Sequence, residues 1–154
     1  MKYIKILFLN LLIIGISIVL TWLSMEIDFV LQFGNYSSNI SITLGFLILL
    51  MGLYFRIKSS LYFYSRNLSI LNLKPQDILI TDGIYSISRN PLYIGIILIF
   101  LGIVLLYGSM TGIFLWIISF LFCDWWVRKK EEKRMQIKFK NTFEVYKKRT
   151  PRWI

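Results

Sequence analysis

Residues 81–95 read TDGIYSISRNPLYIG, and they mark the point where a polar stretch turns into an apolar helix. Gly83 and Pro91 punctuate this stretch. Proline suits the first turn of a helix because its missing N–H would be unpaired there anyway. A short polar loop at the mouth of a membrane helix is a place where a small charged ligand can meet a lipid. The loop is therefore both a boundary of the fold and a candidate site.

The composition of the whole chain is that of a membrane protein. Of the 154 residues, 56% are hydrophobic and 17% are aromatic, whereas a soluble domain of this length is more polar. The apolar residues form long runs and do not recur at helix or strand spacing. The sequence therefore predicts an all-α, polytopic membrane protein with a single domain, 1–154.

Four apolar runs approach the length needed to cross the hydrocarbon core. We expect the first to be an uncleaved span, since residues 21–24 (TWLS) make a poor cleavage site. The aromatic, mildly basic segment 59–76 is expected to form an interfacial helix followed by an extended piece. A basic cytoplasmic helix is expected over 128–148. The predicted spans are 4–23, 40–55, 91–107 and 111–127.

The charges predict the orientation of the chain. All eighteen Lys and Arg residues fall on one side of a four-span arrangement, and the opposite connectors, 24–39 and 107–110, contain none. The positive-inside rule then places both termini and the 81–95 loop in the cytoplasm, with the spans in the inner or plasma membrane. This bias explains the net charge of +10 without a nucleic-acid partner.

The residue types exclude several kinds of chemistry. The chain has no His, so histidine general-base catalysis and histidine-ligated zinc or haem are excluded. Its single cysteine, Cys123, cannot form an internal disulfide or a cysteine metal site, and we expect it to be a small apolar helix residue. No metal is expected.

The third and fourth predicted spans form a hairpin with almost no turn, Gly108-Ser109. Two helices of about 17 residues rise and return, so the chain at residue 131 comes back to the membrane face that it left at residue 90. The hairpin should therefore bring the charged run 128–134 beside 89–93. We expect a cluster of Arg, Asn and Tyr side chains with two adjacent carboxylates.

Each charged member of this cluster also has a purely structural interpretation. Glu131 and Glu132 fit a solvated helix face, in which Arg128 and Glu132 form an i,i+4 pair. Arg89 fits an anchor at the end of a span. Asp124, one turn before Arg128, fits an interfacial ion-pair partner.

The uncharged members have structural interpretations too. Gly95 and Gly102 are seven residues apart and fit a helix-packing stripe. Tyr85 and Tyr93 fit the aromatic belt at the membrane interface.

Taken together, the motifs form a recognisable series. They are Gly83-Ile84-Tyr85, Arg89-Asn90-Pro91-Leu92-Tyr93-Ile94-Gly95, Glu131-Glu132, Phe139 with Phe143-Glu144-Val145-Tyr146, and Arg149-Thr150-Pro151-Arg152-Trp153-Ile154. Over 79–154 this series resembles the superfamily of isoprenylcysteine carboxyl methyltransferases and phospholipid N-methyltransferases. Ile84 replaces the usual Pro, Asn90 stands where eukaryotic members carry His, and the Gly expected after Phe139 is absent.

The resemblance implies S-adenosylmethionine-dependent methyl transfer to a lipid or other lipophilic substrate. It implies that Arg89 pairs with the cofactor carboxylate, that the two Glu accept from its ammonium or ribose hydroxyls, and that Gly95 lets the adenosyl group approach the backbone. The implied catalytic residues are Arg89, Asn90 and Glu132. The implied cofactor contacts are Tyr85, Arg89, Asn90, Pro91, Tyr93, Gly95, Glu131 and Glu132, and the implied substrate contacts are Tyr146 and Arg149.

This chemistry suits a membrane site without metal. Methyl transfer from a sulfonium is an in-line displacement, so the protein mainly positions two reactants in a dry site. The nucleophile stays open. A carboxylate or thiolate arrives ready to attack, whereas an amine must first lose a proton, for which Glu132 or a Tyr could act as base.

Two other functions remain as alternatives. Membrane reductases of the steroid-reductase type, which bind NADPH, resemble the chain around residues 89–93, but the adjacent Glu131-Glu132 and the spacing of the terminal motif fit the methyltransferases better. A helical scaffold is the non-enzymatic alternative, because a basic tail binds anionic lipid in any case.

Overall fold

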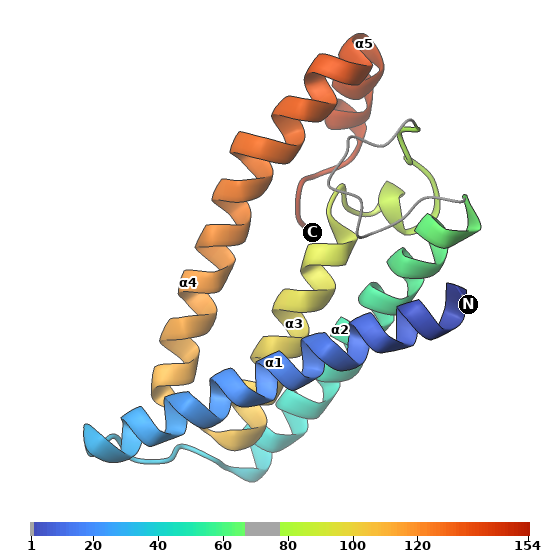
Figure 1. The fold of residues 1–154 in the computed structure, drawn as a ribbon. Helices are drawn as coiled ribbons and strands as arrows, with labels where there is room; N and C mark the ends of the chain where they lie inside the picture. Colours follow the sequence, from blue (N-terminus) through green and yellow to red (C-terminus); the bar gives the residue numbers. More distant parts are fainter. Residues whose placement is uncertain (1, 67–77) are drawn as a thin grey trace.

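A computed structural model describes residues 2–66 and 78–154, and all their regular structure is helical (Figure 1). Three helical segments are long and apolar enough to cross a membrane, and α3 is a shorter apolar helix. The predicted all-α membrane fold is confirmed. The elements are α1 (Lys2–Val30), α2 (Asn39–Ser65), the 3₁₀ turn η1 (Gly83–Ser86), α3 (Pro91–Tyr107), α4 (Met110–Trp126), the π-helical η2 (Val127–Glu132) and α5 (Lys133–Arg149).

The first helix is longer than predicted. It runs to Val30, whereas the sequence suggested an end near residue 23 and a connector over 24–39. Asp28 accounts for the difference, because this carboxylate is buried and accepts hydrogen bonds from the Ser109 hydroxyl and from the backbone and side chain of Thr111. Its carboxylate thus satisfies donors at the start of α4, where backbone N–H groups lack helical partners.

The second helix is also longer, and here the prediction of a short span with a separate interfacial helix was wrong. The helix continues through Arg56 to Ser65, so 59–65 belongs to α2, and most of the rest of the 59–76 segment lies outside the described residues. Ser59 and Ser60 do not break the helix, since their buried hydroxyls donate to the carbonyls of Phe55 and Arg56 one turn earlier.

Glycines bring α2 and α3 into backbone contact. A Cβ on Gly52 would lie 2.7 Å from the Ile99 nitrogen, and one on Gly102 would lie 2.7 Å from the Leu49 nitrogen. A Cβ on Gly95 would lie 2.8 Å from the backbone nitrogen and Cβ of Arg56. The glycine spacing is therefore a helix-packing stripe, because side chains there would force the helices apart.

The helices after α3 diverge from the pair of α2 and α3. Only Gly108 and Ser109 separate α3 from α4, yet α4 leans away from α3 toward the end that carries α5 (Figure 1). Beyond η2 the chain continues as α5, which is kinked at Lys140 (φ 44°, ψ −119°). The last residues then return to the start of α3. This return path brings the chain end to the 81–90 loop.

The glycine stripe predicts the effect of one added methyl group. Gly102→Ala should lower the unfolding temperature in detergent, because overpacking a close contact costs about 1–3 kcal/mol. Gly15→Ala is the matched control, since a Cβ at Gly15 meets nothing within 4 Å. Equal unfolding temperatures for the two variants would show that the contact between α2 and α3 is looser than described.

Candidate functional site

The loop before α3 packs on an apolar cluster. Ile84 and Tyr85, both in η1, are buried against Phe55, Ile80 and Ile94. At the start of η1, Gly83 has φ +59°, and a Cβ there would overlap the Tyr62 ring. The turn is thus fixed by burial and by a glycine that no side chain can replace.

A single carboxylate joins two arginines above this turn. Glu132 Oε1 lies 2.9 Å from Arg89 Nη1, and the side chains of Glu132 and Arg89 are 12% and 8% exposed. Arg152 binds the same carboxylate through both oxygens, with Nε 3.0 Å from Oε1 and Nη2 2.8 Å from Oε2. Such a fork-to-fork pair is strong and geometrically specific. We call Arg89, Glu132 and Arg152 the clasp.

Backbone contacts fasten the chain end to the same loop. The Arg89 N–H donates to the Pro151 carbonyl over 3.0 Å. The carbonyl of Arg152 accepts from the Ser88 hydroxyl at 2.8 Å and from the Asn90 side-chain nitrogen at 3.2 Å. Asn90, predicted to contact the cofactor, is therefore buried in a contact between the loop and the chain end.

The last helix contributes two buried rings. Tyr146 donates its hydroxyl to the Tyr85 carbonyl at 2.6 Å. Phe143, 1% exposed, lies with its ring 5.9 Å from the Arg89 guanidinium. Tyr146 thus holds α5 over the loop, whereas Arg149, the other predicted substrate residue, is exposed on α5.

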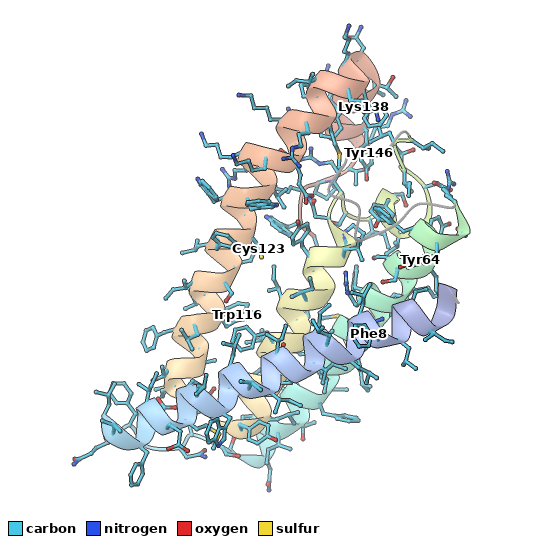
Figure 2. All side chains as sticks on the ribbon, in the orientation of Figure 1. Phe8, Tyr64, Trp116, Cys123, Lys138 and Tyr146 are labelled. Carbon is cyan, nitrogen blue, oxygen red and sulfur yellow. The ribbon has the colours of Figure 1, made fainter. Side chains whose placement is uncertain are left out.

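The second glutamate faces an apolar cavity. Tyr93 donates to Glu131 Oε1 at 2.5 Å, and the same tyrosine lines a cavity of about 330 Å³ together with Phe122, Cys123 and Trp126. Figure 2 shows Cys123 on the side of α4 that faces α3. A polar pair, Tyr93 and Glu131, therefore stands at the edge of an apolar space between the two helices.

Asp124 links α4 to the chain end. It pairs with Arg128 at 2.8 Å, as expected, and accepts from the Trp153 indole nitrogen at 2.9 Å. The predicted pair between Arg128 and Glu132 is replaced by the clasp. The reason is η2, because π-helical turns bond i to i+5 and so rotate the following residues relative to an α-helix.

The clasp leaves hydrogen-bonding capacity unused. Arg89 Nε and Nη1 are buried and make no hydrogen bond of normal geometry, although Nη1 forms the ion pair with Glu132. Burial lowers the pKa of Arg89, while Glu132 opposes this shift. Burial also raises the pKa of Tyr85. The site therefore offers donors that a bound acceptor could satisfy.

A sequence model of the phospholipid methyltransferase family matches residues 40–142, more than half of the chain. The chain belongs to the phospholipid methyltransferase family. No curated protein and no solved structure matched the chain. The family resemblance expected from the motifs is confirmed, and membership in this family supports a membrane methyltransferase.

Two predicted residues of this methyltransferase have a packing role in the structure. Pro91 is buried at the first turn of α3. The position that a Cβ would occupy on Gly95 is filled by Arg56. Their contacts with a cofactor stay predictions. Within the described residues, no group of three or more His, Cys, Asp or Glu could hold a metal ion.

The predicted site residues did not include two arginines that the structure buries or pairs near the loop. Arg152 was noticed only as part of the terminal motif, although it is the bidentate partner of Glu132. The Pro151-Arg152-Trp153 spacing was the signal that pointed to it. Arg56 was taken for the charged end of a span, and only the longer α2 shows that it is buried.

The clasp predicts a large loss of stability when its carboxylate is neutralised. Glu132→Gln leaves two guanidinium groups near each other without their counter-charge, which should cost about 3 kcal/mol of unfolding free energy. Glu144→Gln is the control, because its pair with Lys147 is 42% and 40% exposed and such pairs contribute about 0–1 kcal/mol. Denaturant unfolding in detergent measures both. A Glu132→Gln variant as stable as Glu144→Gln would contradict the clasp.

Proposed function

We propose that the chain is an S-adenosylmethionine-dependent methyltransferase that acts on a lipid at the cytoplasmic edge of the membrane. The observation that carries this proposal is the convergence of the clasp and the pair of Tyr93 and Glu131 beside an apolar cavity. The clasp offers charge for a polar ligand, and the cavity beside Tyr93 and Glu131 offers an apolar space for a lipid. A methyltransferase for lipids needs both in one place.

The described residues fit the groups that S-adenosylmethionine carries. Arg89 has two buried N–H donors without acceptors, which suit a carboxylate. Glu131 suits an ammonium or ribose hydroxyls. The bound cofactor would supply a methyl group activated by a sulfonium. The role of this chain's residues is to orient that group and to exclude water, which favours an in-line displacement.

The cavity provides a route for the lipid. It lies between α3 and α4 and is lined by Phe122, Cys123 and Trp126, beside Tyr93. A lipid chain can enter sideways from the bilayer into such a space, because its lining is as apolar as the bilayer core. The headgroup would then reach Glu131.

The structure favours a different base from the one first expected. Both oxygens of Glu132 accept hydrogen bonds from Arg152. Glu131 accepts from Tyr93 at the edge of the cavity. For an amine substrate, which must lose a proton before attack, we therefore propose Glu131 as the acceptor of that proton.

The orientation and subtype are also proposals. Both termini and the 81–90 loop are placed in the cytoplasm of the inner or plasma membrane, because the Lys and Arg residues gather on that side. The motif series favours an activity like that of the isoprenylcysteine carboxyl methyltransferases. In the substrate site, Tyr146 orders α5 over the loop and exposed Arg149 meets the headgroup.

Cofactor binding separates this function from a reductase or a scaffold. The protein in detergent should bind S-adenosylmethionine saturably and NADPH not at all. Losing a charge-assisted contact should weaken binding about tenfold or more in Arg89→Ala and in Glu131→Gln. Isothermal titration calorimetry measures each affinity.

Glu144→Gln serves as the control, since Glu144 pairs with Lys147 on an exposed face of α5. NADPH binding alone would support the reductase, and heat from neither cofactor would support the scaffold. If both variants bind S-adenosylmethionine as tightly as the wild type, Arg89 and Glu131 do not contact the cofactor.

A further inference from the structure

Arg56 is a buried cation in the middle of an apolar helix. It lies on α2, is 4% exposed, and its Nε has no hydrogen-bond partner. None of the ion pairs found among the described residues includes it. Its backbone is fixed, because Gly95 of α3 packs directly on its Cα and nitrogen. The guanidinium is therefore held in place without a counter-charge in the described part of the chain.

Three tyrosines lie near Arg56, and the hydroxyls of two of them make no hydrogen bond of normal geometry. The guanidinium interacts electrostatically with Tyr85, Tyr93 and Tyr64. The hydroxyls of Tyr64 and Tyr85 are buried and make no hydrogen bond of normal geometry, although the Ser59 hydroxyl lies near enough to interact with that of Tyr85. Tyr64 lies on α2 toward the end of the helix nearest the loop (Figure 2). The Arg56 guanidinium thus lies near two buried hydroxyls that, like its own Nε, make no hydrogen bond of normal geometry.

Such a cluster is unfavourable unless something completes it. A buried charge without a partner costs far more than a buried neutral group, and a buried donor without an acceptor loses its hydrogen bond to water. An oxyanion would remedy both deficits, since it carries the missing negative charge and has several lone pairs.

We propose that Arg56, Tyr64 and Tyr85 form an oxyanion-binding site that receives an acidic group of one of the two reactants. The group is either the carboxylate of S-adenosylmethionine or the phosphodiester of a phospholipid. This inference rests on the proposed function. It assigns a binding role to Arg56 and Tyr64 of α2, a helix that supplies no contact in the proposed function.

The position of the cluster suits a reactant in the proposed site. Tyr93 interacts with Arg56 and also donates to Glu131, and it lines the apolar cavity. Tyr85 interacts with Arg56, and its carbonyl accepts from Tyr146. Arg89 already has Glu132 as a counter-ion. Among the described residues Arg56 has no such counter-ion, so its charge is the one that we expect a reactant to balance. If that reactant is the cofactor, Arg89 positions Glu132 instead.

The test compares Arg56→Gln with the wild type for matched ligands. One arm titrates S-adenosylmethionine and its decarboxylated analogue. The other measures the KM for a phospholipid and for a lipid of the same chains without phosphate. In one arm the wild type should prefer the acidic ligand about tenfold or more, and Arg56→Gln should lose that preference. The arm that responds identifies the source of the oxyanion.

Lys58→Gln is the matched control, because it removes an exposed positive charge two residues away on the same helix. It should keep the preference of the wild type. The unfolding temperature without ligand provides a second readout, and Arg56→Gln should not lower it, since the substitution removes an unbalanced buried charge.

The outcomes separate this inference from the proposed function. If the wild type binds no S-adenosylmethionine, the function itself fails. If it binds and transfers methyl groups but Arg56→Gln keeps both ligand preferences, only the oxyanion site is wrong. A marked loss of stability in ligand-free Arg56→Gln would also overturn it, because Arg56 would then have a structural role.

Discussion

The Glu132 carboxylate holds together three segments that are distant in the sequence. It pairs with Arg89 from the loop before α3 and with Arg152 near the chain end, while its own backbone belongs to η2 after α4. In a chain of net charge +10, these basic segments would otherwise repel each other. The other contacts between loop and tail, such as that of Arg89 with the Pro151 carbonyl, can form because this charge lies between them.

A second constraint is the close packing of α2 against α3, which positions the loop that carries Arg89. Glycines let α2 and α3 touch at the backbone, so the loop that leads into α3 rests on the end of α2. The same contact encloses Arg56. Opposite this rigid pair, α4 leans away and leaves an apolar cavity beside Tyr93. The proposed function needs this combination, since a polar cofactor requires a rigid, charged site and a lipid requires an opening to the bilayer.

Much of this architecture follows from the sequence. Hydropathy gave the helical membrane fold, the two-residue turn at Gly108-Ser109 brought Glu131 back to the loop, and the motif series pointed to the family. The sequence could not show how far α1 and α2 extend, because hydropathy falls at Asp28 and Arg56 while their burial depends on partners from other helices. Nor could it show that η2 turns Glu132 from Arg128 toward Arg152, since helical spacing arguments assume an α-helix throughout.

The central claim is that these parts form a methyltransferase for lipids, and one measurement tests it most directly. Purified protein in detergent would receive S-adenosylmethionine with a labelled methyl group and a total membrane-lipid extract, and the labelled species would be separated and identified. The account predicts label in a lipid, in the wild type but not in Arg89→Ala. Label in no lipid, despite saturable binding of the cofactor, would contradict it.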